Sequence, residues 1–211
     1  MSNVKLYYVK IANRGGSIRD ALRIGKIAFE NIYIPPAGAE RDALADRVTP
    51  LLRQWPVLEV DGKTYTQSNA ILTYVGLRAS LVPHDLLERL RVDEILNACE
   101  DVYGVLGPTM RIADAAEKLA ARAALIAPEG KLTALVKFLN HRYAAGNGTF
   151  VVSPALTIAD LKARHVVNWL QSGQVDGIPK DWLVGIAPTL AAAIDKVNAV
   201  VLERAGDASG I

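Results

Sequence analysis

A polar triplet, Gln67-Ser68-Asn69, follows two short apolar runs and stands at the start of a segment with helical periodicity. A serine in this position is expected to be the N-cap, because its side-chain oxygen can accept from the first helical amides. Those amides also favour an anion such as a carboxylate, and the neighbouring Gln67 amide can both donate and accept. Since capped helices are common, the triplet alone is more typical of a plain cap than of a binding site.

Trp55 and Pro56 precede the first of these apolar runs. X-Pro bonds are the ones that adopt cis at appreciable frequency. A proline placed just before a strand is a plausible site for a bent backbone whose N–H and C=O point outward. The backbone at Trp55 is therefore predicted to pair with the main chain of a peptide-like ligand, as in strand addition.

The overall charge predicts a small-molecule partner. The 211 residues include 24 basic and 22 acidic ones, a net charge of +2, and no run of like charges forms a local patch. This balance gives no support for a nucleic-acid or anionic-membrane partner. The amino terminus lacks a signal-like apolar region and no apolar segment approaches a membrane span, so we expect a cytoplasmic protein.

Cysteine and histidine are too sparse for a metal site. Cys99 is the only cysteine, the three histidines are scattered, and no cluster has metal-ligand spacing, so we expect no metal. Cys99 lies in an apolar-periodic run, where a buried structural thiol is the favoured interpretation over a reactive one.

The first eighty residues alternate between strand and helix patterns. Strands are predicted at 4–9, 31–34, 57–60 and 63–66. Helices are predicted over 16–29 and after Ser68, with a weak helix in the polar segment between the second and third strands. Asp61-Gly62 between the last two strands is a strong hairpin signal, because the turn needs positive φ. The order is βαβαββα.

From residue 86 on, the pattern is entirely helical. Helices are predicted near 86–111, 113–126, 129–145, 158–171 and 188–204, and the last six residues are expected to fray. We therefore expect an α/β domain over 1–80 and an all-helical domain over 86–211. Gly104, Gly107 and Pro108 predict a kink and an open cleft along the long first helix of the second domain, with Leu106 and Met110 in its core.

Two segments carry a family resemblance, PVLEVDGKTYTQSNAILTY and KLYYVKIANRGGSIR. With the element order, they make the chain resemble the cytosolic glutathione S-transferases of the tyrosine type, most closely the sigma class, over essentially its full length. The resemblance implies a thioredoxin-like glutathione-binding domain followed by a helical bundle that lines the electrophile pocket. It also implies a homodimer with glutathione as co-substrate.

The resemblance places several residues around glutathione. It implies that Gln67 and Ser68 hold the γ-glutamyl end, that the Trp55 backbone before cis-Pro56 holds the cysteinyl main chain, and that Asp101 reaches across the dimer. The tryptophan and lysine that grip the glycine carboxylate in sigma-like members have no match between Pro35 and Arg53. Three arginines of that segment are candidates to replace them: Arg41, Arg47 and Arg53.

The catalytic tyrosine of the family matches Tyr8, with Arg14 and Arg19 near it. A free thiol titrates near ~8.5, so a phenol donating to the sulfur would favour the nucleophilic thiolate. Arg14 would add positive potential. Tyr7 is adjacent, but strand alternation puts only one of the two on the pocket side. By family position the electrophile pocket is lined by Ile11, Ala12, Tyr103, Gly107 and Arg111.

Three functions remain open on the sequence. The leading prediction is a transferase that activates the glutathione thiolate for attack on hydrophobic electrophiles. A glutathione-dependent isomerase of the prostaglandin D synthase type would use the same thiol activation. A non-catalytic binding module with this fold is the third.

The segment Thr157–Asp160 matches the family's buried N-capping box, which is a folding device.

Overall fold

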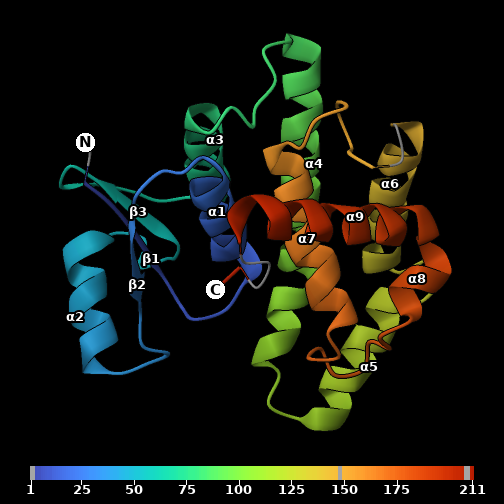
Figure 1. Ribbon diagram of the computed structural model, residues 1–211. Coiled ribbons are helices and arrows are strands. Elements are labelled where there is room, and N and C mark those ends of the chain that lie inside the picture. The colour runs from blue at the N-terminus through green and yellow to red at the C-terminus, as the bar shows by residue number, and fades with distance from the viewer. Residues whose placement is uncertain (1–2, 147–148, 207–209) are drawn as a thin grey trace. The chain divides into compact units, whose positions relative to one another are not determined.

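The computed structural model describes residues 3–146, 149–206 and 210–211 (Figure 1). They form two compact units, one reaching Val82 and including the segment from Val201 on, the other spanning Pro83–Val200. The sequence-based division placed the last residues in the helical domain. They group with the first unit because the Gly210 and Ile211 carbonyls accept hydrogen bonds from Arg19 and Arg23. The expected fraying is therefore wrong for these two residues, and 207–209 lie outside the described ranges.

The first unit is built on a four-stranded sheet in the order β2-β1-β3-β4. Its strands are β1 (Val4–Tyr8), β2 (Glu30–Tyr33), β3 (Val57–Val60) and β4 (Lys63–Tyr65). β1 pairs in parallel with β2, and the other two pairings are antiparallel. The predicted hairpin is confirmed, with φ values of 48° and 80° at Asp61 and Gly62. Together with its helices this sheet has the predicted thioredoxin-like βαβαββα order.

Three helices cover this sheet: α1 (Asn13–Ile24), α2 (Ala39–Val48) and α3 (Ser68–Arg78). α1 and α3 pack on each other on one side of the sheet, and α2 lies on the other side (Figure 1). On the α2 side, Tyr7, Ile34, Val48 and Val57 form a buried apolar cluster. α1 ends before the predicted Phe29, at Gly25, where a Cβ would lie 2.6 Å from Cβ of Ala79. Gly25 allows this close approach, and the positive φ of 50° at the next residue, Lys26, takes the chain out of the helix.

The second unit is helical, as predicted. Its helices are α4 (Leu86–Leu106), α5 (Ala115–Ile126), α6 (Lys131–Ala145), α7 (Ile158–Gln171), α8 (Trp182–Ile186) and most of α9 (Pro188–Ala205). α4 and α7 pack closely and bury Cys99, and burial raises the pKa of its thiol to about 12. The five residues of α8 were not predicted, because one short turn carries too few apolar positions to show periodicity. No helix within the described ranges is long and apolar enough to cross a membrane.

The kink predicted in the first helix of this unit takes the form of a change in helix type. α4 ends at Leu106 and the chain continues as a 3₁₀ helix, η1 (Gly107–Arg111). Leu106 is buried as expected, whereas Met110 is 44% exposed, so its assignment to the core is wrong. The tighter 3₁₀ turn rotates Met110 away from the position that continued α-helical periodicity would give it.

The capping box at the start of α7 is confirmed. The Asp160 carboxylate accepts from the Thr157 backbone N–H at 2.9 Å and from the Thr157 hydroxyl at 2.8 Å. Its other oxygen accepts from the Val151 N–H and the Tyr143 hydroxyl. All four donors come from within the second unit, so Asp160 ties the start of α7 to the preceding loop and to α6.

Candidate active site

The strand registers bring three of the predicted site residues to one end of the sheet. Tyr7 pairs with Val57, and Leu58 pairs with Tyr65. Tyr8 ends β1, Pro56 immediately precedes β3 and Gln67 follows the end of β4, so these three residues lie at the same end of the sheet. The Trp55-Pro56 bond is cis, as expected. A polar ligand bound there would therefore contact residues from three different parts of the chain.

Two helices begin at this end of the sheet. α1 follows the carboxyl end of β1 and α3 follows β4, and neither has a side-chain hydrogen bond at its N-cap or an acidic residue in its first turn. The first amides of a helix carry partial positive charge and favour anions. This end of the first unit is thus electrostatically suited to a carboxylate.

Ser68 is not the N-cap that the sequence predicted. It is the first residue of α3, and Gln67 is the N-cap, with φ 71° and ψ 106°. The positive φ at Gln67 turns the chain one residue earlier than a serine cap would. A non-glycine residue in this region of φ is uncommon and is often found at ligand sites. Ser68 is buried and Gln67 is exposed, so the two neighbours present different groups to this end of the sheet.

The two adjacent tyrosines of β1 face opposite sides of the sheet. Tyr7 lies in the apolar cluster beneath α2, and its hydroxyl donates to Glu59 Oε2 at 2.7 Å. Tyr8 faces α1, where its ring lies against Gly15 and the Arg19 guanidinium is 5.6 Å from the ring centroid. The Tyr7 hydroxyl is therefore committed to a strand neighbour, and Tyr8 is the one beside the start of α1.

Electrostatics keep Tyr7 a neutral phenol. Burial, together with the hydrogen bond to Glu59, raises the pKa of Tyr7 to about 12. The same hydrogen bond, with Lys5 at 3.3 Å, lowers the pKa of the Glu59 carboxyl. This trio connects the two central strands and is structural.

The loop between β1 and α1 carries the other predicted residues of the first unit. Ile11 is 45% exposed, Ala12 is half-buried, and Arg14 lies in the first turn of α1. Arg19, fully buried, donates to the carbonyls of Val9 and Ile11 at 3.2 and 2.8 Å, and its Nε donates to Oδ1 of Asn31. Burial lowers the pKa of Arg19, although carbonyl, amide and ring partners surround its guanidinium. Arg19 therefore fixes the loop that leads from Tyr8 to Arg14.

The three arginines considered for the glycine carboxylate have different surroundings. Arg53 is held by the carboxylates of Asp42 and Asp46. Arg47 lies 5.9 Å from the Tyr7 ring centroid. Arg41 lies 5.8 Å from the Trp55 ring centroid and donates to the Pro35 carbonyl. Arg41 is thus the one that lies against the residue preceding the cis-proline.

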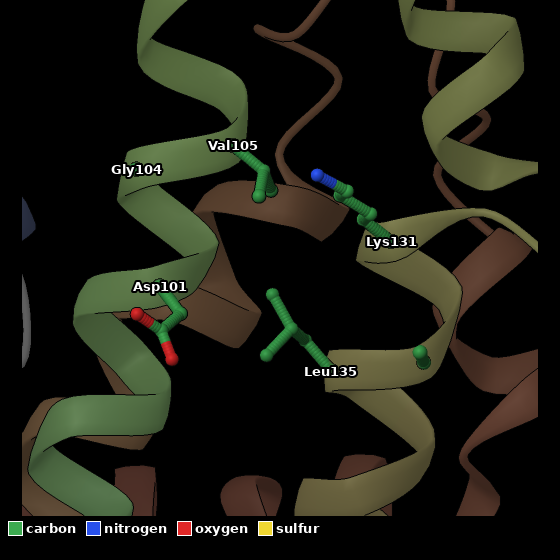
Figure 2. A pocket seen from close by; sticks show the side chains of 6 residues that line it. Asp101, Gly104, Val105, Lys131 and Leu135 are labelled. Atoms are coloured by element: carbon green, nitrogen blue, oxygen red, sulfur yellow. The ribbon is translucent and has the colours of Figure 1, made fainter.

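In the second unit, Asp101 lines an open groove between α4 and α6 (Figure 2). The groove has a volume of ≈ 430 Å³ and an apolar floor, with the Asp101 carboxylate on the α4 side and Lys131 on the α6 side. Asp101 is exposed. The remaining lining residues are Gly104, Val105, Ala134 and Leu135.

Tyr103, Gly107 and Arg111 follow one another at intervals of four along α4 and η1. The Tyr103 ring is buried, with the Trp169 centroid at 5.5 Å and the Lys162 ammonium 5.7 Å from its own centroid. Lys162 is itself fully buried and pairs with Glu100. Gly107 is half-buried and Arg111 is exposed. Tyr103 is therefore held rigidly, whereas Arg111 projects from the end of η1.

Sequence reasoning missed one residue of this site, Gly15. A Cβ at this position would lie 2.6 Å from Cγ of Tyr8, so only glycine allows the tyrosine ring to pack against the start of α1. The signal was present in the Gly15-Gly16 pair, since two glycines at the start of a helix disfavour helix formation and need a packing reason.

Comparison with solved structures defines the class of protein to which this architecture belongs. A sigma class glutathione S-transferase from Fasciola hepatica superposes with a TM-score of 0.81, at 20% identity over 97% of this chain and 94% of that one. The prostaglandin synthase D of Nilaparvata lugens gives 0.78, at 23% identity over 95% and 92%. At these identities the likeness establishes the cytosolic glutathione S-transferase fold.

Sequence comparison then identifies the family. Residues 3–76 match the family described as "Glutathione S-transferase, N-terminal domain". Glutathione S-transferase A of the guinea pig, Cavia porcellus, is 30% identical over 156 residues, which are 74% of this chain and 70% of that protein. The chain belongs to the glutathione S-transferase family. Several other curated relatives match over 98 residues, and for these the match spans 44% of their length.

Proposed function

We propose that this protein is a glutathione S-transferase that activates the glutathione thiolate for attack on hydrophobic electrophiles. The observation that supports the proposal is the position of Tyr8, cis-Pro56 and Gln67 at the same end of the sheet, where α1 and α3 begin. Family membership supports the same activity.

Each residue has a defined task in this proposal. The amides at the start of α3, with Ser68 and the Gln67 side chain, bind the γ-glutamyl carboxylate. The Trp55 backbone pairs with the cysteinyl main chain, which brings the sulfur toward Tyr8. The Tyr8 hydroxyl donates to the sulfur and stabilises the thiolate over the thiol, so that the nucleophile forms near neutral pH. Arg14 adds positive potential beside it.

The glycine end of glutathione is assigned to Arg41. Arg53 is already neutralised by two carboxylates, and Arg47 lies over a tyrosine that belongs to the core. Arg41 lies over Trp55, and its Nη1 donates to the Pro35 carbonyl. We assign the glycine carboxylate to the other two nitrogens of its guanidinium, Nε and Nη2.

The remaining assignments follow the family. The electrophile binds beside Ile11, Ala12, Tyr103, Gly107 and Arg111. The protein works as a cytoplasmic homodimer in which Asp101 reaches the glutathione of the other subunit, and the reaction uses glutathione as co-substrate without a metal. Neither a membrane nor a nucleic acid is a partner in this proposal.

A glutathione-dependent isomerase is the second candidate. The fold is shared with the prostaglandin synthase of Nilaparvata lugens, and the same thiolate would serve both reactions. The two differ in their products, because a transferase keeps the sulfur bonded to the electrophile whereas an isomerase releases glutathione unchanged.

One assay tests the proposal. The purified protein is incubated with glutathione and a chloronitrobenzene, and the conjugate is measured together with retention on immobilised glutathione. Conjugation with retention is expected. Retention without conjugation would favour the isomerase, or a binding module if a prostaglandin endoperoxide is also left unchanged. Loss of both would reject glutathione as the ligand.

A further inference from the structure

Arg122 is a buried arginine on α5 that contacts two other segments of the second unit, η1 and the loop after α7. Its side chain is almost completely inaccessible, at 2% exposure for the residue. Nε donates to the Thr109 hydroxyl at 3.0 Å, Nη2 lies 3.0 Å from the Met110 sulfur, and Nη1 donates to the Asp176 carbonyl at 2.9 Å. Each of the three guanidinium nitrogens therefore has a partner in η1 or in the loop after α7.

Most of these partners are neutral. Among the residues that the structure describes, the carboxylate within ion-pair distance is that of Asp176, which is 3.7 Å away and 75% exposed. Burying a cation against neutral acceptors is unfavourable compared with an apolar side chain of the same size. A fully apolar contact would hold α5 in place equally well. The guanidinium therefore has to be explained by the particular atoms that it orients.

The atoms that it orients belong to a weak helical segment. η1 has five residues, and 3₁₀ helices longer than three or four residues are uncommon because their hydrogen bonds are poorly aligned. Thr109 both accepts from Arg122 and donates to the Leu106 carbonyl at 2.8 Å. A continuous chain of hydrogen bonds thus runs from Arg122 through Thr109 to the last residue of α4.

We propose that Arg122 is the positioning residue for the electrophile end of the pocket, because it fixes the η1 turn that carries Gly107 and Arg111. The inference rests on the proposed function for the role of these two residues. The guanidinium itself is buried behind η1 and has no direct contact with substrate. It acts by holding the backbone of η1 in one geometry, so that its removal weakens electrophile binding and leaves glutathione binding intact.

Three substitutions and a control test this role. Arg122→Met keeps an unbranched apolar side chain and removes all five donors, and Arg122→Lys keeps the charge with fewer donors. Thr109→Val removes the hydroxyl with little change of shape. Lys118→Met, one turn earlier on α5, is the matched loss of a cation that lies outside this network.

The readouts separate positioning from general stability. The KM values for the chloronitrobenzene and for glutathione are measured separately, and equilibrium dialysis measures chloronitrobenzene binding without glutathione. Hydrogen exchange is followed at the Ile112 amide, which donates to the Thr109 carbonyl within the turn. Thermal unfolding reports how much each variant is destabilised overall.

For Arg122→Met we expect the chloronitrobenzene KM and its dissociation constant to rise by about five- to fiftyfold, as small misplacements of a site do. The glutathione KM should stay within about twofold, a change too small to indicate a lost contact. Exchange at Ile112 should accelerate more than exchange in α7. Arg122→Lys should recover part of the loss, Thr109→Val should show it more weakly, and Lys118→Met should resemble the wild type.

Parallel rises in both KM values, or unchanged exchange at Ile112, would overturn the inference and leave Arg122 a general stabiliser of α5. If Arg122→Met does not fold, Thr109→Val decides, because it removes one acceptor and keeps the guanidinium. A wild type that binds chloronitrobenzene without conjugating it would contradict the proposed function alone. The dialysis and exchange measurements would still test whether Arg122 positions η1.

Discussion

Gly15 has no room for a side chain, because a Cβ atom there would lie 2.6 Å from Cγ of Tyr8. The contact joins the start of α1 to the carboxyl end of β1, the two elements that meet at the candidate active site. The position of the Tyr8 ring therefore depends on residue 15 having no Cβ atom.

Gly15→Ala is expected to lower the conjugation rate by about ten- to a hundredfold, because the Tyr8 ring or the first turn of α1 must shift. Steady-state kinetics measure the change. Gly185→Ala is the control, since a Cβ at that helical position would meet no atom of the described residues within 4 Å beyond its chain neighbours and its own helix. Full activity in Gly15→Ala would show that conjugation does not depend on the position of the Tyr8 ring.

The two tyrosines of β1 should respond differently to loss of the hydroxyl. Tyr8→Phe is expected to lower the rate by about one to three powers of ten near neutral pH with little change in glutathione affinity, because the phenol acts on the charge of the sulfur. Tyr7→Phe loses the bond to Glu59 and should cost about 1 kcal/mol of stability with little effect on rate. The reverse pattern of rates would show that the catalytic tyrosine is Tyr7.

Ser68→Ala should weaken glutathione binding more than it lowers stability. Ser68 stands at the first position of α3, where the proposed γ-glutamyl carboxylate meets the helix amides. Thermal melts with and without glutathione separate the two effects. A drop in melting temperature of the same size in both conditions would make Ser68 a structural residue only.

Asp160→Ala should do the opposite and destabilise the fold by about 2–4 kcal/mol, because it leaves buried donors of Thr157, Val151 and Tyr143 without their acceptor. Denaturant unfolding measures the loss. The remaining folded protein should bind glutathione as the wild type does, and a loss of affinity without a loss of stability would contradict the assignment of Asp160 to folding.

Asp101→Ala is expected to raise the glutathione concentration needed for half-maximal rate, with the fold intact, if the residue reaches across a homodimer. Light scattering on the wild type and the variant establishes the number of subunits at the assay concentration. Asp101 is exposed and free to meet a second subunit. A wild type that is fully active as a monomer would remove both the interface and the shared site.

Glu59 should contribute to acid sensitivity. Its folded-state pKa is lowered by the Tyr7 hydrogen bond and by Lys5, so as the pH falls the unfolded chain takes up the proton first. The stabilisation is present above the unfolded pKa of about 4.3 and is lost as the pH falls through the lower folded value. Urea midpoints of Glu59→Gln and wild type should therefore differ more at pH 7 than at pH 3. An equal difference at both pH values would assign the effect to packing.

Periodicity and turn chemistry were enough to predict most of the fold. The Asp61-Gly62 hairpin was predicted from residues close in sequence, whereas the cis bond before Pro56 and the capping box of Asp160 were expected mainly from the family resemblance. The start of α3 was predicted one residue late, because the positive φ of Gln67 is a backbone conformation that a glutamine in the sequence does not indicate.

Contacts between distant residues could not be predicted in the same way. The packing of Gly15 against Tyr8 depends on how α1 crosses the sheet, and the hydrogen bonds of Arg122 join α5 to η1 and to the loop after α7. Met110 was assigned to the core because α-helical periodicity was extended through Gly107, where the structure changes to 3₁₀. In each case the deciding geometry is tertiary.

The hydrogen bonds from Arg19 and Arg23 to the carbonyls of Gly210 and Ile211 have a consequence for the order of folding. During synthesis the strands and helices of the first unit leave the ribosome long before these two residues do, although domains generally fold as they emerge. Until then the buried Arg19 guanidinium lacks one of its acceptors, and an unmade buried hydrogen bond is destabilising. The first unit therefore reaches its final set of hydrogen bonds only after the helical unit has been made.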